Sequence, residues 1–490
     1  MTTLTIDDET IRHLASTQWI AGRAIAARGD EWIRLLDPAS GKLLADVPRG
    51  CPDDAEYAIA AARRAQGDWA RRAVAQRGAM LRQAAHRLRE IQEPVVELLV
   101  RNNGKTLAEA RAEVAMCPPL IESLVELGHQ LGGRCVQTSV DELLFQYRNP
   151  RGVAVCLSTW NAPVVAAIEM AAACLIVGNT CVLKTSERAP LAPRLAFERC
   201  FDHLPEGVLS VLCGDGPNMG SPLVSHSETD VVCFIGSVGV GRRIAESAGR
   251  RVRKAILELG GKDAFIIDET VDPRVAARFV APTCFALSGQ ICSSTERIYV
   301  MRQVYEPFVE EMAAVTSGLR VGPGLDPTSQ MGPLIDESIL TNVENHVSAA
   351  TAAGARTLVG GRRLDRPGCF YAPTVLTGVD DGMLVMQEET FGPIAPILAV
   401  DTFDEAIARA NGTSFGLCAN VCTQTGPRAI QAIHELEAGV VRINAGRGGI
   451  MHCSQEPTKN SGIGSGHGIE FLEELTYRKS VRWRGKLAES

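Results

Sequence analysis

Strand-like and helix-like patterns alternate along residues 152–235, and this alternation constrains the fold more than any other feature. Each strand-like run is almost continuously apolar, which is typical of strands buried on both faces of a sheet. Strands separated by helices at this spacing predict a parallel, doubly wound α/β sheet, which binds ligands beyond the carboxyl ends of its strands. We expect strands at residues 152–158, 179–184, 207–212 and 230–235, and helices at 163–177 and 192–203.

Length and charge narrow the class of protein. A chain of 490 residues exceeds one compact core, and its formal net charge of −7 is mildly acidic. A nucleic-acid-binding protein would carry a basic patch or stripe. The most apolar helical stretch, 163–177, contains Glu169 and is shorter than the ~20 residues of a membrane span. We therefore expect neither a nucleic-acid partner nor a membrane association.

Cysteine usage bears on the cellular compartment. The fifteen cysteines are odd in number, scattered, and contain no C-x-x-C pair. This pattern argues against a disulfide framework and against a zinc site. The first residues also lack the basic and apolar regions of a signal peptide. We expect a reducing compartment, the cytoplasm, and no metal site.

One cysteine, Cys292, stands in an unusual setting. Most of the others lie in apolar runs, where a free cysteine behaves as a small buried hydrophobe. Cys292 instead follows Gly289 and Gln290, and the small polar residues 293–295 behind it are expected to bury little. The residues alone leave two interpretations open, a core thiol, which is the commoner, and a nucleophile.

Two polar residues near predicted strand ends also have two interpretations. Glu258 lies inside an apolar strand beside paired glycines. It is either an edge-strand carboxylate that faces water or a general base with a raised pKa. Asn161 follows the first strand, and its residue type favours a helix N-cap over an amide that donates to an oxyanion.

Three further stretches suit a nucleotide. G-S-V-G-V-G (236–241) follows the fourth strand, where glycines let a pyrophosphate approach a helix N-terminus, although the spacing also fits a tight turn. Lys184 and Glu187 lie at another strand end, as ribose contacts or as a surface ion pair. E-E-T-F-G-P (388–393) is a third such stretch, or a loop with a buried Phe391.

These stretches, in this order, resemble the aldehyde dehydrogenase superfamily. The likeness covers nearly the whole chain, from D-P-A-S-G-K at residues 37–42 to K-N-S-G-I-G at residues 459–464, and G-Q-I-C with the upstream L-E-L-G-G-K is its most specific part. It implies an α/β fold with two doubly wound Rossmann-like domains and a small β oligomerisation arm. The implied parts are an NAD-binding domain (1–131 and 151–257), a catalytic domain (258–475), and an arm (132–150 and 476–490) that builds a homodimer or homotetramer.

The resemblance implies NAD(P)-dependent oxidation of an aldehyde to a carboxylic acid. Cys292 would form a thiohemiacetal and then a thioester. The Asn161 amide and the Cys292 backbone N–H would hold the oxyanion, and Glu258 would activate water for hydrolysis. Glu187 favours NAD, with NADP possible, because a carboxylate near the ribose 2′-position repels a phosphate. The residues implied to bind the cofactor are Trp160, Lys184, Ser186, Glu187, Gly216, Phe234, Gly236, Ser237, Val240, Glu389 and Phe391.

Several positions depart from the common family pattern. Met170 and Gly466 replace a lysine and a glutamate that serve a proton relay behind the general base in some members. We therefore expect Glu258 to exchange protons with bulk water by another route. Glu456 and Pro457 replace paired glycines of the C-terminal pattern.

The substrate channel departs as well. Ala162 replaces a phenylalanine and, with Ala166, predicts a wide channel for a bulky or aromatic aldehyde. Glu169 replaces an often aromatic residue; it either meets a basic or hydroxylated substrate or, as we favour, points at solvent or pairs with an arginine. The expected channel residues are Ala162, Ala166, Glu169, Ile291 and Ser293.

Two other functions compete with a hydrolytic dehydrogenase. CoA-acylating relatives release the thioester to CoA but usually lack the glutamate found here as Glu258. Non-catalytic relatives that keep the fold tend to lose the nucleophile found here as Cys292. Both residues are present, so the hydrolytic enzyme is the interpretation that the sequence favours.

Overall fold

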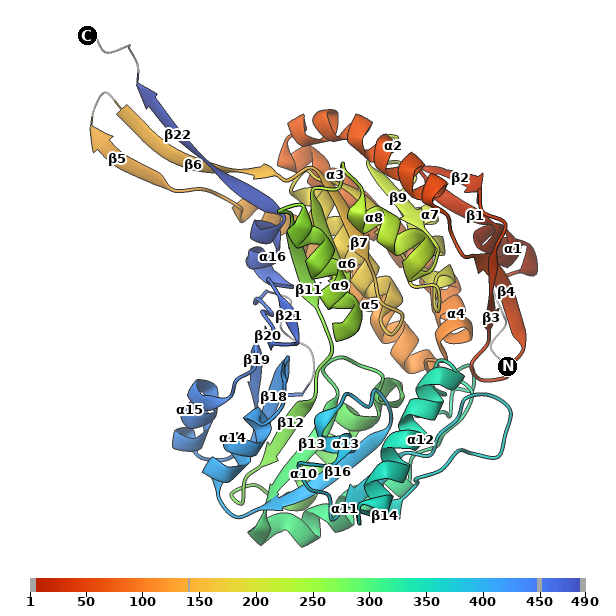
Figure 1. Ribbon diagram of the computed structural model, residues 1–490, viewed down its shortest axis with the longest axis vertical. Helices are drawn as coiled ribbons and strands as arrows, with labels where there is room; N and C mark the ends of the chain where they lie inside the picture. Colours follow the sequence, from red (N-terminus) through yellow and green to blue (C-terminus); the bar gives the residue numbers. More distant parts are fainter. Residues whose placement is uncertain (1–5, 140–141, 447–451, 485–490) are drawn as a thin grey trace.

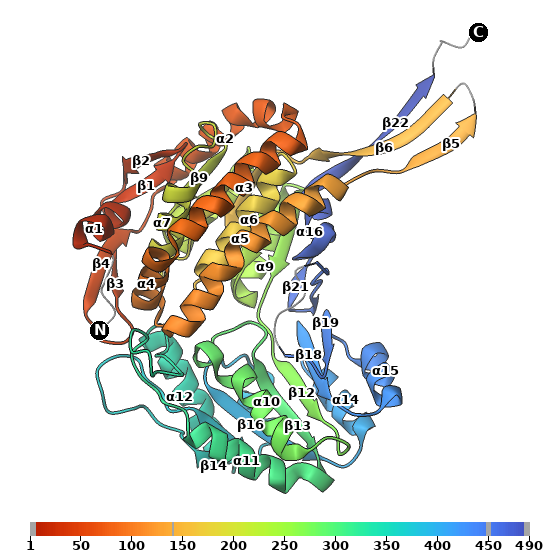
Figure 2. The same ribbon diagram turned by 180° about the vertical axis from the view of Figure 1, so that it is seen from behind.

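The computed structural model describes residues 6–139, 142–446 and 452–484. Two large sheets, each flanked by helices, make up the body of the molecule, and a three-stranded sheet projects from it (Figure 1). The view from behind shows helices covering the opposite faces of the same sheets (Figure 2).

The first sheet has eight strands in the order β2-β1-β9-β8-β7-β10-β11-β21. Its five central strands run parallel, and β1 and β21 add to it antiparallel at either side. Each strand predicted between residues 152 and 235 is present, which confirms the doubly wound sheet. The strands are β1 (Thr17–Ile20), β2 (Arg23–Ala26), β7 (Val153–Leu157), β8 (Thr180–Lys184), β9 (Leu209–Leu212), β10 (Val231–Ile235), β11 (Lys254–Glu258) and β21 (Gly462–Ile463).

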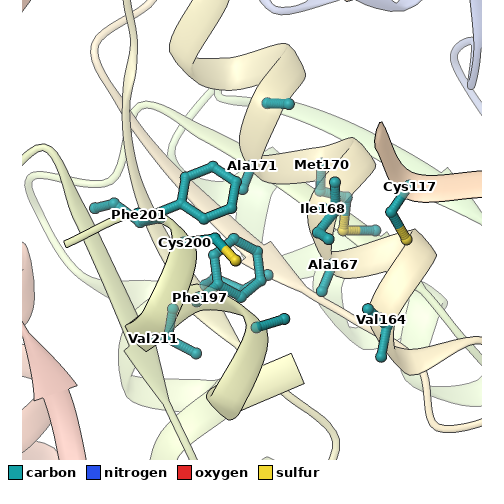
Figure 3. Packing of buried hydrophobic residues seen from close by; sticks show 14 of the residues in the cluster. Cys117, Val164, Ala167, Ile168, Met170, Ala171, Phe197, Cys200, Phe201 and Val211 are labelled. Atoms are coloured by element: carbon teal, nitrogen blue, oxygen red, sulfur yellow. The ribbon is translucent and has the colours of Figure 1, made fainter. Parts of the chain in front are cut away.

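Both faces of this sheet are buried, as the continuous apolar runs predict. Ala154 and Cys156 of β7 pack into one core with helices α3 to α7, while Val153 and Val155 pack into another with α2, α8 and α9. Figure 3 shows part of the first core, where Met170 of α6 lies near Cys117 of α5. The helices are α1 (Asp8–Ser16), α2 (Pro52–Arg71), α3 (Val74–Glu90), α4 (Gln92–Asn103), α5 (Leu107–Gln130), α6 (Pro163–Ile176), α7 (Leu191–Cys200), α8 (Ser221–Ser225) and α9 (Val238–Arg250).

The second sheet has seven strands in the order β14-β15-β16-β13-β12-β18-β19. Helices α10 and α11 cover one face, and α12 to α15 cover the other. The strands are β12 (Asp263–Ile267), β13 (Thr295–Met301), β14 (Arg356–Val359), β15 (Thr374–Thr377), β16 (Ile394–Val400), β18 (Cys418–Cys422) and β19 (Val440–Ile443); the helices are α10 (Pro273–Phe285), α11 (Tyr305–Ser317), α12 (Glu337–Ala352), α13 (Leu384–Gln387), α14 (Phe403–Asn411) and α15 (Gly426–Glu435).

The projecting sheet joins two distant segments of the chain. β22 (Thr476–Arg484) pairs antiparallel with β6 (Glu142–Pro150), from Thr476 opposite Pro150 to Arg484 opposite Glu142, and β5 (Cys135–Ser139) pairs with the other edge of β6. The end of the predicted arm, 485–490, and the first residues of the predicted NAD-binding domain, 1–5, lie outside the described residues. The remaining elements are β3 (Trp32–Leu36), β4 (Leu43–Pro48), β17 (Phe415–Gly416), β20 (Thr458–Lys459) and α16 (Gly468–Glu474).

Helix α6, which carries several of the predicted channel residues, begins without a side-chain cap of its own. Its N-cap residue is Ala162. Glu113 of α5 caps it instead, since one carboxylate oxygen accepts hydrogen bonds from Val164 N at 2.9 Å and Val165 N at 3.2 Å. The other oxygen pairs with the buried ammonium of Lys105. In the part of the chain that the structure describes, no helix is long and apolar enough to cross a membrane.

Replacing Glu113 by alanine should destabilise the fold, because it leaves Lys105 buried without its partner and the start of α6 without acceptors. We expect the free energy of unfolding to fall by about 3 kcal/mol, the usual cost of breaking a buried ion pair. Glu122→Ala is the matched control, because Glu122 lies on the same helix in an exposed pair with Arg89 at 2.8 Å. Urea unfolding followed by circular dichroism measures both, and equal losses would contradict this account.

Candidate active site

Two cavities meet at Cys292. The first cavity, of about 420 Å3, is lined by all eleven residues predicted to bind the cofactor. The second cavity, of about 380 Å3, is lined by all five predicted channel residues and by Glu258. Cys292 and Asn161 line both cavities. The predicted nucleophile therefore lies where a molecule in one cavity can meet a molecule in the other.

The backbone before Cys292 is held in an uncommon conformation. Leu287, Ser288 and Gly289 all have positive φ, at 50°, 56° and 74°. Side chains from elsewhere hold this turn: the Leu287 N–H donates to Glu109 at 2.6 Å, and Gln290 accepts from Ile335 N at 2.9 Å. A Cβ at Gly289 would overlap the Gly392 carbonyl. Strain of this kind persists only where the surroundings fix it, and it is common at functional sites.

The polar residues after Cys292 do not behave as the sequence suggests. Ser294 and Thr295 are 2% and 1% exposed, so the expectation that they bury little is wrong. They remain buried because hydrogen bonds satisfy them: Ser294 Oγ donates to the Thr283 carbonyl at 3.0 Å, and the Thr283 and Thr295 hydroxyls lie 2.8 Å apart.

Glu258 is not an edge-strand carboxylate that faces water. It ends β11, between Ile235 of β10 and Gly462 of β21, so another strand covers its outer side. Its Oε1 is buried and has no hydrogen-bond partner among the described residues. Burial raises the pKa of Glu258, with the Cys292 thiol acting in the opposite direction. A partly desolvated carboxylate with a raised pKa has the properties of a general base.

The Cys292 thiol and the Glu258 carboxylate influence each other. Burial, and then the charge of Glu258, raises the pKa of Cys292 well above its usual range. The thiol is therefore neutral at neutral pH, and only a thiolate is a good nucleophile. Glu258 is the neighbouring carboxylate that can accept the thiol proton when a reactant arrives.

Asn161 does not cap the following helix, so the capping interpretation is wrong. The N-cap position of α6 is the next residue, Ala162. The Asn161 side chain is turned toward the Cys292 loop, where its Nδ2 donates to the Gln290 carbonyl at 3.0 Å and its Oδ1 accepts from the Thr159 hydroxyl at 2.7 Å. A second N–H of the same amide remains available to a ligand.

The glycines of L-E-L-G-G-K permit two close approaches. A Cβ at Gly260 would overlap the Glu389 carboxylate, and a Cβ at Gly261 would lie 2.6 Å from the Cys292 carbonyl. Glu389 accepts a hydrogen bond from Gly261 N at 3.1 Å, and burial raises its pKa to about 8. The paired glycines therefore bring the Cys292 loop and the 388–393 loop together.

The first cavity has aromatic and charged walls. Trp160 and Phe391 meet edge to face, with ring centroids 5.3 Å apart, so Phe391 lines the cavity instead of filling a core. Lys184 and Glu187 form an ion pair at 3.0 Å, in the cavity wall and not at an open surface. Ser237 is the N-cap of α9, and a Cβ at Gly236 would overlap the Phe234 ring. The glycine turn thus presents a helix N-terminus to the cavity.

The second cavity contains a charged pair that the sequence does not predict. Glu169 is 9% exposed and its carboxylate contacts Nδ1 of His467. The expectation that Glu169 points at solvent or pairs with an arginine is wrong, because its side chain turns inward from α6 toward the segment before α16. The Glu169 charge raises the pKa of His467 to about 9.

Comparisons with known proteins agree with this geometry. The model of the aldehyde dehydrogenase family matches residues 25–481. This chain belongs to the aldehyde dehydrogenase family. It is 34% identical to the 3,6-anhydro-alpha-L-galactose dehydrogenase of Vibrio sp. (strain EJY3) over 468 residues, or 94% of this chain and 98% of that one. It is 33% identical to the lactaldehyde dehydrogenase of Escherichia coli (strain K12) over 467 residues, or 94% and 97% of the two chains.

The fold comparison gives the same family. A betaine aldehyde dehydrogenase from Staphylococcus aureus, solved in complex with NAD+, has a TM-score of 0.95 to this structure at 30% identity, covering 98% of this chain and 97% of that one. The predicted family and α/β fold class are therefore confirmed. NAD(P)-dependent oxidation of aldehydes is the activity of this family.

The departures of this aldehyde dehydrogenase from the family pattern lie close together. Met170 is 4% exposed and packs in the first core, and Gly466 exchanges backbone hydrogen bonds of 2.7 and 2.9 Å with Gln455. The residues next to them in sequence, Glu169 and His467, supply the charged pair. In the loop where Glu456 and Pro457 replace the paired glycines, Glu456 is exposed and Pro457 is buried. An isolated β-bridge between Gln455 and Gly466 joins the two ends of this segment.

Several supporting residues escape prediction from the sequence. Glu296 holds the 388–393 loop, because its carboxylate accepts from Thr390 N at 2.8 Å, Phe391 N at 2.9 Å and the buried Lys262 ammonium at 2.6 Å. Asn103 Nδ2 donates to the Trp160 carbonyl at 2.7 Å. A glutamate inside the apolar strand that follows Cys292 is the one signal that could have indicated Glu296.

Proposed function

We propose that this chain oxidises an aldehyde to a carboxylic acid with NAD, through a covalent intermediate on Cys292 that water hydrolyses. The observation that carries the proposal is the position of Cys292 at the junction of two cavities, beside Glu258. The first cavity suits a dinucleotide and the second an aldehyde. The family activity supports the same assignment.

The residues of the first cavity fit a dinucleotide. The glycine turn at Gly236 leaves room that a Cβ would fill, and the N-terminus of α9 there favours a pyrophosphate. Lys184 and Glu187 would bind ribose hydroxyls, and Glu187 disfavours a 2′-phosphate, so NAD is preferred over NADP. When bound, the cofactor supplies the hydride acceptor for the oxidation. Trp160, Ser186, Gly216, Phe234, Ser237, Val240, Glu389 and Phe391 would complete the contacts.

The chain's own residues carry the covalent steps. Glu258 takes the thiol proton, and the Cys292 sulfur adds to the aldehyde carbon to give a thiohemiacetal. The free N–H of the Asn161 amide and the Cys292 backbone N–H stabilise the oxyanion. After oxidation to the thioester, Glu258, having released the thiol proton to bulk water, removes a proton from a water molecule, the water oxygen bonds to the acyl carbon, and the C–S bond breaks.

A bulky or aromatic aldehyde is the substrate that we propose. Ala162 and Ala166 line the second cavity where larger side chains would narrow it, and its volume of about 380 Å3 lies in the range of drug-sized ligand sites. Ile291 and Ser293 flank the nucleophile on the same wall. The relatives are named for lactaldehyde, betaine aldehyde and an anhydro-sugar, so their names differ too widely to fix the size of the substrate.

The competing functions are weaker. Release of the thioester to CoA needs no general base for water, whereas Glu258 lies half-buried next to Cys292 with a raised pKa. A non-catalytic role gives no reason for the strained turn that holds the thiol between two cavities. Neither alternative accounts for the thiol and the carboxylate together.

The assembly and compartment are also proposals. We propose that residues 1–131 and 151–257 form the NAD-binding domain, 258–475 the catalytic domain, and 132–150 with 476–490 the oligomerisation arm of a homodimer or homotetramer. The projecting sheet supports this, because its exposed apolar side chains include Leu143, Tyr147 and Trp483. Fifteen free thiols suit the reducing cytoplasm.

Replacing Cys292 by alanine should abolish turnover while leaving cofactor binding intact. We expect NADH formation across a panel of short, long, aromatic and amino-aldehydes for the unmodified protein, and a loss of at least about 1,000-fold for Cys292→Ala. Cys418→Ala is the control, since Cys418 packs beside Cys292 but lines neither cavity. Turnover by Cys292→Ala would contradict the mechanism.

Replacing Gly236 by alanine should weaken NADH binding, because the new Cβ overlaps the Phe234 ring in the wall of the first cavity. We expect a dissociation constant raised at least about tenfold, equivalent to about 1.4 kcal/mol. Gly239→Ala, in the same glycine turn, meets no atom within 4 Å and should bind normally. Titration of NADH fluorescence measures both, and an unchanged affinity in Gly236→Ala would count against this site.

Replacing Ala162 by phenylalanine should penalise large aldehydes more than small ones, because Ala162 lines the second cavity and the ring would take up part of its volume. We expect kcat/KM to fall at least about tenfold for aromatic aldehydes, or about 1.4 kcal/mol, and little for acetaldehyde. Steady-state kinetics with the two classes decides the matter. Similar losses for both would remove the case for a bulky substrate.

A further inference from the structure

Two carboxylates and one histidine gather in the second cavity. Glu258 comes from the end of β11, Glu169 from α6, and His467 from the segment between β21 and α16. His467 contacts Glu169 directly. The two positions that carry a proton relay in some relatives are Met170 and Gly466 in this chain. His467 is therefore not one of those relay residues.

The backbone fixes His467 at this position. β21 pairs with β11 so that Gly462 lies opposite Glu258, and Gly466 closes a bridge with Gln455 just before the histidine. His467 itself has φ 58° and ψ 172°, a conformation that non-glycine residues rarely adopt. A strained backbone of this kind persists only where contacts with the surrounding residues hold it. One such contact is that of the His467 ring with Glu169.

The titratable groups around His467 come from several elements. Besides Glu169 and Glu258, the cavity is lined by Cys292, by Cys233 of β10 and by Arg442 of β19. Among the described residues that line the cavity, Arg442 is the other cation; burial raises the pKa values of Asp263 and Cys418, and Arg442 opposes that effect. Burial and the nearby Glu169 charge raise the pKa of Glu258. The positive charge of His467 acts in the opposite direction and lowers it.

The charge of His467 is nearly constant at neutral pH. With a pKa of about 9, the imidazolium outnumbers the neutral ring roughly 100-fold at pH 7. An imidazolium that already holds its proton is a poor acceptor for another. His467 therefore acts as a fixed positive charge near Glu258 and not as a proton carrier.

We propose that His467, held by Glu169, is a positioning residue for Glu258: its charge keeps the Glu258 carboxylate ionised for the hydrolysis of the thioester. In that step a proton of water passes to the carboxylate, the hydroxide oxygen bonds to the acyl carbon, and Cys292 leaves as the thiolate. This inference rests on the proposed function. The expectation that Glu258 exchanges protons with bulk water by another route stays a prediction, because a fixed charge carries no proton.

The test compares His467→Gln with His467→Lys in the full-length enzyme. Pre-steady-state NADH bursts measure acylation, and kcat as a function of pH measures deacylation when hydrolysis limits turnover. In His467→Gln we expect the acid limb of kcat to move up by about one pH unit, so that kcat falls about tenfold at pH values below both limbs and by a smaller factor at pH 6.5. The burst should keep its amplitude but slow at low pH as well, because Glu258 also accepts the thiol proton, and KM should change less than about threefold. His467→Lys restores the charge and should recover kcat to within about threefold.

His226→Gln is the matched control, because Nε2 of His226 also contacts a glutamate, Glu56, at 2.8 Å, away from both cavities. It should leave the pH profile unchanged. A rise in KM alone for His467→Gln would assign the pair to substrate recognition and overturn the inference. Equal slowing of burst and turnover in both His467 variants would make the role purely structural and overturn it as well.

Failure of the proposed function gives a different result. If the unmodified enzyme shows no turnover that depends on Cys292, the proposed function fails and the inference falls with it. If turnover depends on Cys292 and His467→Gln keeps the original acid limb, the proposed function stands and this inference alone is wrong.

Discussion

The contact between the Cys292 thiol and the Glu258 carboxylate, two half-buried groups, is the constraint on which the rest of the site depends. Desolvation raises the pKa of both groups, so the resting site holds a neutral thiol beside a base that can take its proton. Such a pair needs an apolar enclosure and also open access for two reactants. The junction of two cavities meets both needs.

The two sheets share the construction of this site. Glu258 ends a strand of the first sheet, and Cys292 lies in the turn before β13 of the second (Figure 1). The chain crosses from one sheet to the other through residues 259–262, the L-G-G-K part of the motif. Gly260 and Gly261 leave space at this crossing for Glu389 and for the Cys292 carbonyl, so a side chain at either position would push the two halves of the site apart.

Much of the fold follows from local sequence, because strands buried on both faces read as continuous apolar runs. Every strand predicted in the first sheet is present, and β7, β8, β9 and β10 differ from the predicted bounds by at most two residues. The edge hairpin of β1 and β2 gives no such signal, because β2 is largely exposed and only four residues long.

The site was harder to predict where contacts join distant segments. Asn161 looks like a helix cap in sequence, but Glu113, 48 positions earlier, caps the helix through tertiary contact. Glu169 and His467 are 298 residues apart, and no local pattern places them together. The pairing of β21 with β11 brings them into contact. Because β21 has only two residues, no periodicity in the sequence could indicate it.

The central claim is that Cys292 carries an acyl group that Glu258 helps water to remove. Intact-protein mass spectrometry of Glu258→Gln, after prolonged mixing with NAD and an aldehyde at alkaline pH, tests it most directly. The amide cannot accept the proton of water, while solvent at that pH can still take the thiol proton that Glu258 would otherwise accept. The account predicts a mass increase equal to one acyl group, mapped to Cys292 and absent when Cys292 is also replaced by alanine. An unmodified protein after a full equivalent of NADH has formed, or an acyl group on another residue, would contradict it.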